Sequence, residues 1–179
     1  MAVEAPSTDK ARLEELYRLH GDDIARWAAR LGGPGADVED LVQEVFLVIA
    51  RKFRDFRGDA ALATWLFGIT ANVVRNRRRS DRRWGWLKAL AEQAASALPA
   101  VAGDPGESMD RAEERARFYR ILDRLNEAER TALILFEIEG LSGQEVAQLT
   151  GVRTEVVWVR LTRARRRFLR LFKNSAGRK

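Results

Sequence analysis

Residues 125–152 read LNEAERTALILFEIEGLSGQEVAQLTGV, residues 154–168 read TEVVWVRLTRARRRF, and together they decide the fold of the carboxy-terminal half. Twice in this stretch, a side chain that caps helices precedes a glutamate by three residues, which is the spacing of a capping box. The two capping boxes are Asn126 with Glu129, and Ser142 with Glu145. Gly140 lies between them and can end the first helix. The stretch therefore predicts short helices with sharply defined ends.

The second part of this stretch predicts a helix-turn-helix. QEVAQLTGV makes a short helix that ends in a turn at Thr150 and Gly151, and Thr154 can cap the next helix. The apolar side chains of that last helix recur at helical spacing and are Val157, Leu161, Ala164, Phe168 and Phe172. Two short helices joined by a tight glycine turn, the second rich in arginine, are typical of DNA-binding proteins.

Basic residues gather in two separate segments. The segment from Arg160 to Lys173 holds seven Lys and Arg and no acid, and the segment from Arg75 to Lys88 holds seven with one acid, Asp81. Two separated basic patches suit a protein that contacts DNA at two places. The alternative is that both are solvated helix faces.

The amino-terminal half begins with two predicted helices. The first has apolar residues at steps of three and four and ends at Gly32. His20 lies in that apolar stripe, so we interpret it as a packed residue without a chemical role. The second helix starts at Asp37, whose carboxylate can cap it, and runs through VEDLVQEVFLVIARKF. Its start carries acidic and amide side chains, and periodicity alone favours a structural role for them, because acids suit the amino-terminal end of a helix.

A third helix runs through ALATWLFGITANVVRNRRRSDRR, and its two faces differ. The apolar stripe is Leu62, Trp65, Leu66, Ile69 and Val73. The opposite, polar strip is Gly68, Asn72, Arg75, Asn76 and Arg79. We interpret Trp65 as a core residue first and as a stacking platform for bases second, because it lies on the apolar stripe.

A segment rich in alanine and small residues separates the two halves and reads as a tether. We therefore predict an all-α protein of two small helical domains joined by a flexible linker, the second domain being the helix-turn-helix. The boundaries are 1–83 for the first domain, 84–107 for the linker and 108–179 for the second. Residues 87–97 of the linker could form a loose or partner-dependent helix.

The composition excludes several kinds of protein. The chain has no cysteine, which removes disulfides, thiol nucleophiles and thiolate zinc sites. It has no apolar run long enough to span a membrane and no secretory signal pattern, so we expect a cytoplasmic protein. An enzyme acting on nucleic acid would need paired metal-binding carboxylates or an activated nucleophile, and we find neither. We therefore predict no catalytic residue, no metal site and no cofactor.

The segments quoted above resemble the extracytoplasmic-function sigma factors of bacterial RNA polymerase. Three extended motifs carry the resemblance: DVEDLVQEVFLVIARKF, FRGDAALATWLFGITANVVRNRRR, and the stretch at 125–152 followed by VRLTRARRRF. They occur in the family's order and cover both predicted domains. The resemblance implies a first domain that binds core polymerase and melts the −10 promoter element, and a second that reads the −35 element.

The resemblance also implies roles for individual residues of the first domain. Asp40, Gln43 and Glu44 would dock on the clamp coiled coil of the β-prime subunit. Asn72 and Asn76 would hold a base flipped out of the duplex, because an amide offers both a donor and an acceptor to a base edge. Phosphates of the −10 element would be bound by Arg75, Arg77, Arg78 and Arg79. The loop over residues 56–60 would complete this pocket.

In the last helix, the resemblance assigns −35 base contacts to Trp158, Val159, Thr162 and Arg163, and phosphate contacts to Arg160 and Arg166. Here the chain departs from the family, which commonly has Lys or Arg followed by Ser where this chain has Trp158 and Val159. The two apolar residues could contact thymine methyl groups, pack against a regulatory partner, or belong to a reader of a divergent promoter. The sequence leaves these alternatives open.

The partners implied are core RNA polymerase, through its β-prime clamp and β flap, promoter DNA, and an anti-sigma factor that is often membrane-bound. We expect no insertion of this chain into a membrane, and a monomer outside complexes. Trp84, Trp86 and Trp158 could offer apolar area to a partner or pack in the free protein. The main rival is a free-standing helix-turn-helix regulator, which would leave the first domain unexplained.

Overall fold

The computed structural model of the chain describes residues 6–53, 56, 61–92 and 109–176. Side chains are described for residues 11–53, 56, 61–82 and 111–174. These ranges contain helices and the turns between them, and no strand occurs in this part of the chain. The predicted all-α class is therefore confirmed.

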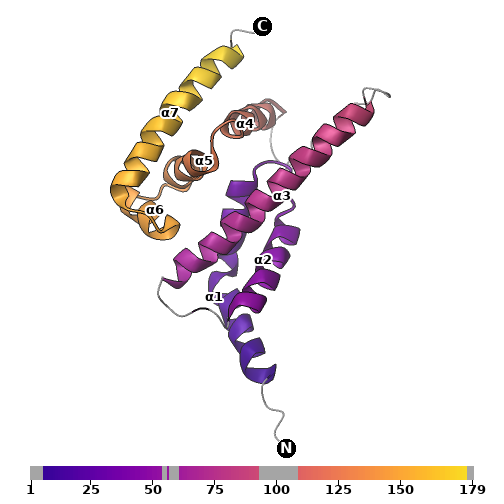
Figure 1. The fold of residues 1–179 in the computed structure, drawn as a ribbon, viewed down its shortest axis with the longest axis vertical. Coiled ribbons are helices and arrows are strands. Elements are labelled where there is room, and N and C mark those ends of the chain that lie inside the picture. Colours follow the sequence, from indigo (N-terminus) through magenta and orange to yellow (C-terminus); the bar gives the residue numbers. More distant parts are fainter. Residues whose placement is uncertain (1–5, 54–55, 57–60, 93–108, 177–179) are drawn as a thin grey trace, which may run out of the picture.

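Three helices of the amino-terminal half pack against one another: α1 (Pro6–Gly32), α2 (Val38–Lys52) and α3 (Leu62–Glu92). In Figure 1, α3 runs diagonally through the middle of the molecule, with α2 on one side of it and α1 passing behind it. The α2 helix begins where its cap was predicted, because the Asp37 carboxylate accepts a hydrogen bond of 3.0 Å from the Asp40 backbone N–H.

The helices of the carboxy-terminal half lie on the other side of α3, with α4 and α5 between α3 and α7 (Figure 1). They are α4 (Met109–Leu122), α5 (Glu127–Leu133), the π-helical segment η2 (Ile134–Ile138), α6 (Gly143–Thr150) and α7 (Thr154–Ala176). The α5 helix continues directly into η2, where the Glu139 N–H bonds to the Ile134 carbonyl at 3.1 Å. In a π turn the N–H bonds to the carbonyl five residues earlier, where an α-helix uses the carbonyl four residues earlier.

Two of the three helix starts predicted in the carboxy-terminal half are confirmed. The Asn126 side chain accepts from the Glu129 N–H at 2.9 Å at the start of α5, which is one of the two hydrogen bonds of the predicted capping box. At the start of α6, Ser142 and Glu145 form both hydrogen bonds of a capping box, at 3.2 Å and 2.7 Å. Hydrogen bonds between residues three positions apart therefore fix where α5 and α6 begin.

Two helix ends differ in detail from the expectation. Thr154 is the first residue of α7 and not the residue before it, so the helix starts without the predicted threonine cap. The α3 helix continues to Glu92, past residue 83 where we predicted the first domain to end. The first part of the predicted linker is therefore helical, and the remainder of it, residues 93–107, lies outside the described residues.

Apart from Ile121, the buried apolar side chains of both halves belong to one connected cluster. Its most enclosed members include Ile24, Val45, Leu66, Leu122, Ile134, Val146 and Leu161. Tyr17 of α1 lies outside this cluster: it is 59 % exposed and contacts the Phe46 ring at 5.0 Å between centroids. Trp65 is half-buried against Phe53 and Phe56, which agrees with its interpretation as a core residue.

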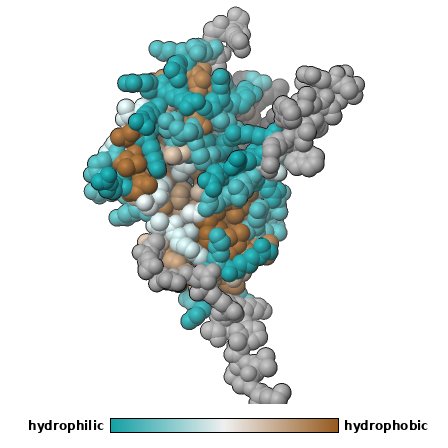
Figure 2. Space-filling view, viewed as in Figure 1, coloured by the Kyte–Doolittle hydropathy of each residue, from teal (hydrophilic) through white to brown (hydrophobic). Residues whose placement is uncertain are grey.

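Figure 2 shows a largely hydrophilic face that is interrupted by separate apolar patches. The exposed large apolar side chains of the described residues are Tyr17, Leu19, Leu47, Trp158, Val159, Leu169 and Phe172. They come from α1, α2 and α7, so the surface that could receive partners is divided among several helices.

Candidate nucleic-acid interface

Five of the six residues predicted to meet the −35 element lie together on one face of α7. Trp158, Val159, Thr162, Arg163 and Arg166 line a single shallow hollow and are all exposed. The sixth, Arg160, lies at the side of α7 and lines a different hollow, together with residues of α3, α5 and α6. The helical spacing of the five residues explains why they share a face.

The short helix α6 and the turn after it hold α7 in place. Gly151 ends α6 with φ +65°, the left-handed conformation in which glycine is favoured, and this permits the tight turn into α7. The hydrogen bond from the Ser142 backbone N–H, followed by that from its side chain, lowers the pKa of the Glu145 carboxyl below its usual value. The charged carboxylate of Glu145, which accepts a hydrogen bond of the capping box, is thus the favoured form.

The arginines of α7 divide into two groups. Arg165 pairs with Glu137 at 2.7 Å and lies over the Phe136 ring at 5.2 Å, and Arg167 lies 4.0 Å from Glu129. Arg160, Arg163 and Arg166 have no ion pair with any residue that the structure describes. The three arginines predicted to meet DNA are therefore among those whose charge is not matched by a carboxylate of the described chain, and the exposed Arg170 is unmatched as well.

On α3, the residues predicted to meet the −10 element do not share one environment. Asn72, Arg75, Asn76 and Arg79 are exposed. Arg75 donates to the Asn72 side-chain oxygen at 2.5 Å, which leaves the Asn72 amide N–H groups available. Asn72 and Arg75 line the same hollow as Arg160, so the two predicted DNA surfaces meet there.

Arg77 lies between two acids of α2. Its Nη2 is 2.6 Å from Asp40 Oδ2 and 3.0 Å from Glu44 Oε2, and hydrogen bonds to Glu44 and then Asp40 raise the Arg77 pKa. A predicted phosphate ligand thus pairs with two predicted polymerase contacts. The third polymerase contact, Gln43, is exposed and lines a groove between α1 and α2 instead.

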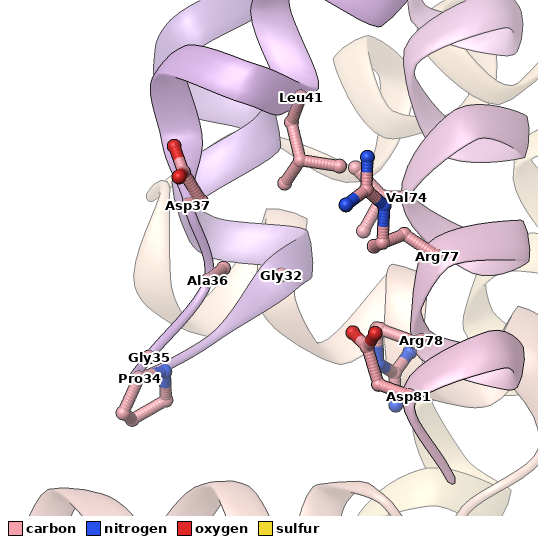
Figure 3. Close-up of a pocket in the computed structure, with 10 residues that line it drawn as sticks. All are labelled: Gly32, Pro34, Gly35, Ala36, Asp37, Leu41, Val74, Arg77, Arg78 and Asp81. Carbon is pink, nitrogen blue, oxygen red and sulfur yellow. The ribbon is translucent and has the colours of Figure 1, made fainter. Parts of the chain in front are cut away.

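Arg78 is directed away from Arg77 and is buried. Figure 3 shows the two guanidinium groups leaving α3 in different directions beside the loop that joins α1 to α2. The Arg78 side chain is 10 % exposed, with Nη2 2.6 Å from Asp123 and Nη1 3.3 Å from Glu127. In this arrangement its guanidinium is engaged by the carboxy-terminal half, and DNA phosphates could reach it only after those partners move.

A second buried arginine completes this junction, which we call the arginine clasp (Arg78, Arg130, Asp123 and Glu127). The Arg130 side chain is 1 % exposed, donates to the Leu31 carbonyl at 2.7 Å and lies 3.3 Å from Asp123. Burial, and then the nearby charge of Arg78, lower the Arg130 pKa to about 10, so it stays charged at neutral pH. The clasp joins α1 and α3 to the carboxy-terminal half.

Comparison with known families decides the identity of both halves. Residues 16–84 match the family Sigma-70 region 2, and residues 115–168 match Sigma-70, region 4. The sigma-E factor of Escherichia coli K12, an ECF RNA polymerase sigma factor, is 33 % identical over 138 residues, which cover 74 % of this chain and 72 % of the relative. The chain belongs to the ECF sigma factors.

Other relatives agree with this assignment. The RNA polymerase sigma factor CnrH of Cupriavidus metallidurans is 31 % identical over 169 residues, covering 92 % of this chain and 88 % of its own length. The solved structure of CnrH with the cytosolic domain of CnrY matches with a TM-score of 0.59 at 26 % identity, over 92 % of this chain and 90 % of that one. RpoE of Bartonella quintana, solved with the anti-sigma factor NepR, has the same fold at a TM-score of 0.53 and 24 % identity, covering 89 % and 96 %.

The helical period of α3 could have predicted that Arg78 is buried in this sigma factor. Arg78 follows the buried residues Val74 and Phe67 by four and eleven positions, which places it on their face of α3. The sequence gave no comparable indication that Arg130 donates a hydrogen bond to Leu31, because Leu31 belongs to a helix far away in the sequence. The carbonyl that receives an arginine in this way cannot be found from local sequence.

Two of the predictions concern side chains that the structure does not describe. Residues 57–60 of the predicted pocket loop and the side chains of Trp84 and Trp86 lie outside the described residues. Among the side chains that are described, no group of three or more acids or histidines is placed to hold a metal ion. Across the described helices, none is long and apolar enough to cross a membrane.

Proposed function

We propose that this sigma factor binds core RNA polymerase with α2, captures the −10 element with α3 and reads the −35 element with α7. The observation that carries the proposal is the shared open face of α7, where five predicted −35 residues lie together. The arginines of that face lack ion pairs within the described chain, so they can neutralise phosphates and release counterions. The mechanism is binding, with no bond made or broken by the protein.

For the −35 element, each side chain of α7 has a separate task. Arg160 and Arg166 would hold phosphates and fix the register of the helix in the major groove. Arg163 would donate to a guanine edge, and Val159 would contact a thymine methyl group. The Thr162 hydroxyl already donates to the Trp158 carbonyl at 2.8 Å, so it would accept a hydrogen bond from a base amine.

For the −10 element, Asn72 and Asn76 would receive a base that leaves the stack as the duplex opens. Unpairing and unstacking cost a few kcal/mol, which hydrogen bonds to the exposed base edge can offset without ATP. Arg75 and Arg79 are exposed beside the two asparagines and would hold the adjacent phosphates. The predicted contribution of Arg78 requires the arginine clasp to open, since both its carboxylate partners lie in the other half of the chain.

Polymerase binding would use Asp40, Gln43 and Glu44 against the β-prime clamp, while the second domain would meet the β flap. Asp40 and Glu44 are about half exposed, so basic groups of the clamp could replace or join Arg77 as their partners. Charges of this kind orient a complex more than they strengthen it. The division into residues 1–83, 84–107 and 108–179 would let the two domains separate on the polymerase.

Regulation by an anti-sigma factor is part of the proposal. CnrH was solved with the cytosolic domain of CnrY, and RpoE with the anti-sigma factor NepR. We infer that an anti-sigma factor, which could itself be anchored in a membrane, covers the polymerase and DNA surfaces of this chain. Between such complexes the protein would be a monomer in the cytoplasm.

Run-off transcription tests the proposal directly. Core polymerase is incubated with and without this protein on a library of promoter fragments, and the transcripts are sequenced. The expected result is initiation from a defined subset that depends on the added protein and reveals both promoter elements. Binding of DNA without any association with core polymerase would instead favour a free-standing regulator.

A further inference from the structure

The two helices of the helix-turn-helix meet at a glycine and a tryptophan as well as at their turn. Gly143 is the first residue of α6 and is buried. A Cβ atom added to it would lie 2.6 Å from Cζ2 of the Trp158 indole and 3.1 Å from Cε2 and Cη2. Nonbonded carbon atoms prefer separations of about 3.5 to 4.0 Å. The indole therefore lies against the first turn of α6 in space that a glycine leaves open.

A second aromatic ring also contacts this indole. Phe136 of η2 meets Trp158 edge to face, with centroids 5.6 Å apart and planes at 71°. The Phe136 ring carries the guanidinium of Arg165 at 5.2 Å, and Arg165 is tied to Glu137 at 2.7 Å. Trp158 is thus in contact with both α6 and η2 while it belongs to α7.

We propose that Trp158 is a positioning residue, which fixes the angle between α6 and α7 and so sets how the neighbouring side chains enter the −35 major groove. The proposal rests on the proposed function of α7. The Gly151 turn connects α6 to α7, and the buried Val157 and Leu161 belong to the same core cluster as Val146 of α6. The indole adds a contact on the outer side of α7, against the first turn of α6. Side chains that recognise a ligand must be held to within about 0.5 Å, and an indole wedged against α6 restrains rotation of α7 on its buried face.

This role distinguishes Trp158 from the residues beside it. Trp158 is 46 % exposed and shares its face with Val159, Thr162 and Arg163, so exposure alone would make all four base readers. The indole, however, is engaged on α6 and η2, whereas Val159 and Arg163 have no such contact in the described chain. Discrimination between bases therefore falls to the three neighbours, and Trp158 determines their placement.

A double-variant cycle tests this role in the complete holoenzyme. The variants are Trp158→Ala, Trp158→Phe, Gly143→Ala and the Gly143→Ala, Trp158→Ala pair, each full-length and assembled with core polymerase. The probe is a set of promoter fragments with a randomised −35 element upstream of one constant −10 element, read out by transcript sequencing. Core binding and the unfolding midpoint of each variant establish that it is folded.

We expect Trp158→Ala to lower −35-dependent transcription about tenfold and to flatten base preference at every position of the element together. Trp158→Phe should restore most of the loss, because a ring still reaches α6. Gly143→Ala should cause a similar loss when Trp158 is present and none when it is alanine. Alanine ordinarily strengthens a helix relative to glycine, so a loss in the first background would come from the indole contact.

Two results would overturn the proposal. Loss of preference at a single base pair in Trp158→Ala would make Trp158 a base reader. An equal effect of Gly143→Ala in both backgrounds would show that the contact does not set the angle. Arg163→Ala separates this failure from that of the proposed function: if it leaves every preference unchanged, the register of α7 is wrong, whereas a normal Arg163 effect beside an additive cycle removes only the positioning role.

Discussion

The α3 and α7 helices carry similar numbers of arginines but use them differently. On α3, Arg77 and Arg78 are each held by two carboxylates, and Arg78 is buried among residues of the other half. On α7, the residues facing the proposed −35 element have no such partners among the described residues, and the paired arginines lie to the side. Charge density along a sequence therefore identifies a basic helix, but position on the helix decides which arginines remain available for DNA.

The largest expected effect concerns the arginine clasp. Arg130→Ala leaves a cavity where a fully buried side chain lay and leaves the Leu31 carbonyl without its donor, so we expect a loss of about 3 kcal/mol in the free energy of unfolding. Chemical denaturation of the full chain measures it. Arg165→Ala is the matched control, because that exposed pair should contribute no more than about 1 kcal/mol. Equal losses for both variants would remove the distinction between buried and exposed arginines.

The Asn72→Ala, Asn76→Ala double variant should have the next largest effect. Two lost base contacts should reduce promoter opening about 100-fold, while binding to core polymerase stays normal because both side chains are exposed and neither is a predicted polymerase contact. Permanganate footprinting of the opened strand and a core-binding assay measure the two properties. Normal opening by this variant would remove the assignment of the −10 pocket.

On α7, Arg163→Ala should weaken discrimination of the −35 element by about 1–3 kcal/mol. The cause is the loss of a donor pair to one base, so the change should concentrate at one position of the element. Competition between promoter variants on the holoenzyme measures it. Arg170→Ala is a control on the same helix, because Arg170 is exposed but does not line the −35 hollow.

Arg78 and Arg79 are neighbours that sharpen the contrast within α3. Arg78→Ala should lower the free energy of unfolding by about 1–2 kcal/mol, since two partly exposed carboxylates lose their partner. Arg79→Ala should leave stability within about 0.5 kcal/mol and weaken binding to single-stranded −10 DNA on the holoenzyme. Chemical denaturation measures the stability of both variants, and filter binding measures their affinity for the single-stranded −10 DNA. A reversed pattern would mean that the clasp is absent in solution.

The smallest effect is that of pH on the α6 cap. Hydrogen bonds from Ser142 lower the Glu145 pKa, so the stabilisation is complete above the unfolded pKa of about 4.3 and is lost as pH falls through the lower folded value. Glu145→Ala should therefore be less stable than the parent chain at neutral pH, and the gap should close under acid conditions. Denaturation curves for both chains across this range measure it. A gap that is constant with pH would show that the carboxylate charge does not matter.

Local patterns predicted the parts of this molecule that depend on near neighbours. The caps at Asp37, Asn126 and Ser142 were found because a cap involves only residues three positions apart. The −35 residues of α7 were named by the family resemblance, and their helical spacing accounts for the face that five of them share. Both kinds of feature are properties of one helix and its first turn.

Contacts between distant helices could not be predicted in this way. Periodicity showed that one face of α3 is buried, but not that Arg78 would reach Asp123. The η2 turn had no signal, yet it brings Glu139 to Arg26 and Arg30 of α1 at 2.9 Å and 2.8 Å. Likewise, the contact that gives Trp158 a structural role depends on the absence of a side chain at Gly143, whose neighbour is not evident from sequence.

The ion pairs of Glu139 also limit how this protein can be recombined. Promoter specificity is often imagined as modular, with one reading domain exchanged for another. Here the carboxy-terminal half supplies Glu139 to two arginines of α1 and Asp123 to an arginine of α3. A chimaera that takes its second half from another sigma factor would keep the three basic partners and lose their acids. Grafting a new −35 preference should therefore replace the exposed face of α7 and leave the rest of that half native.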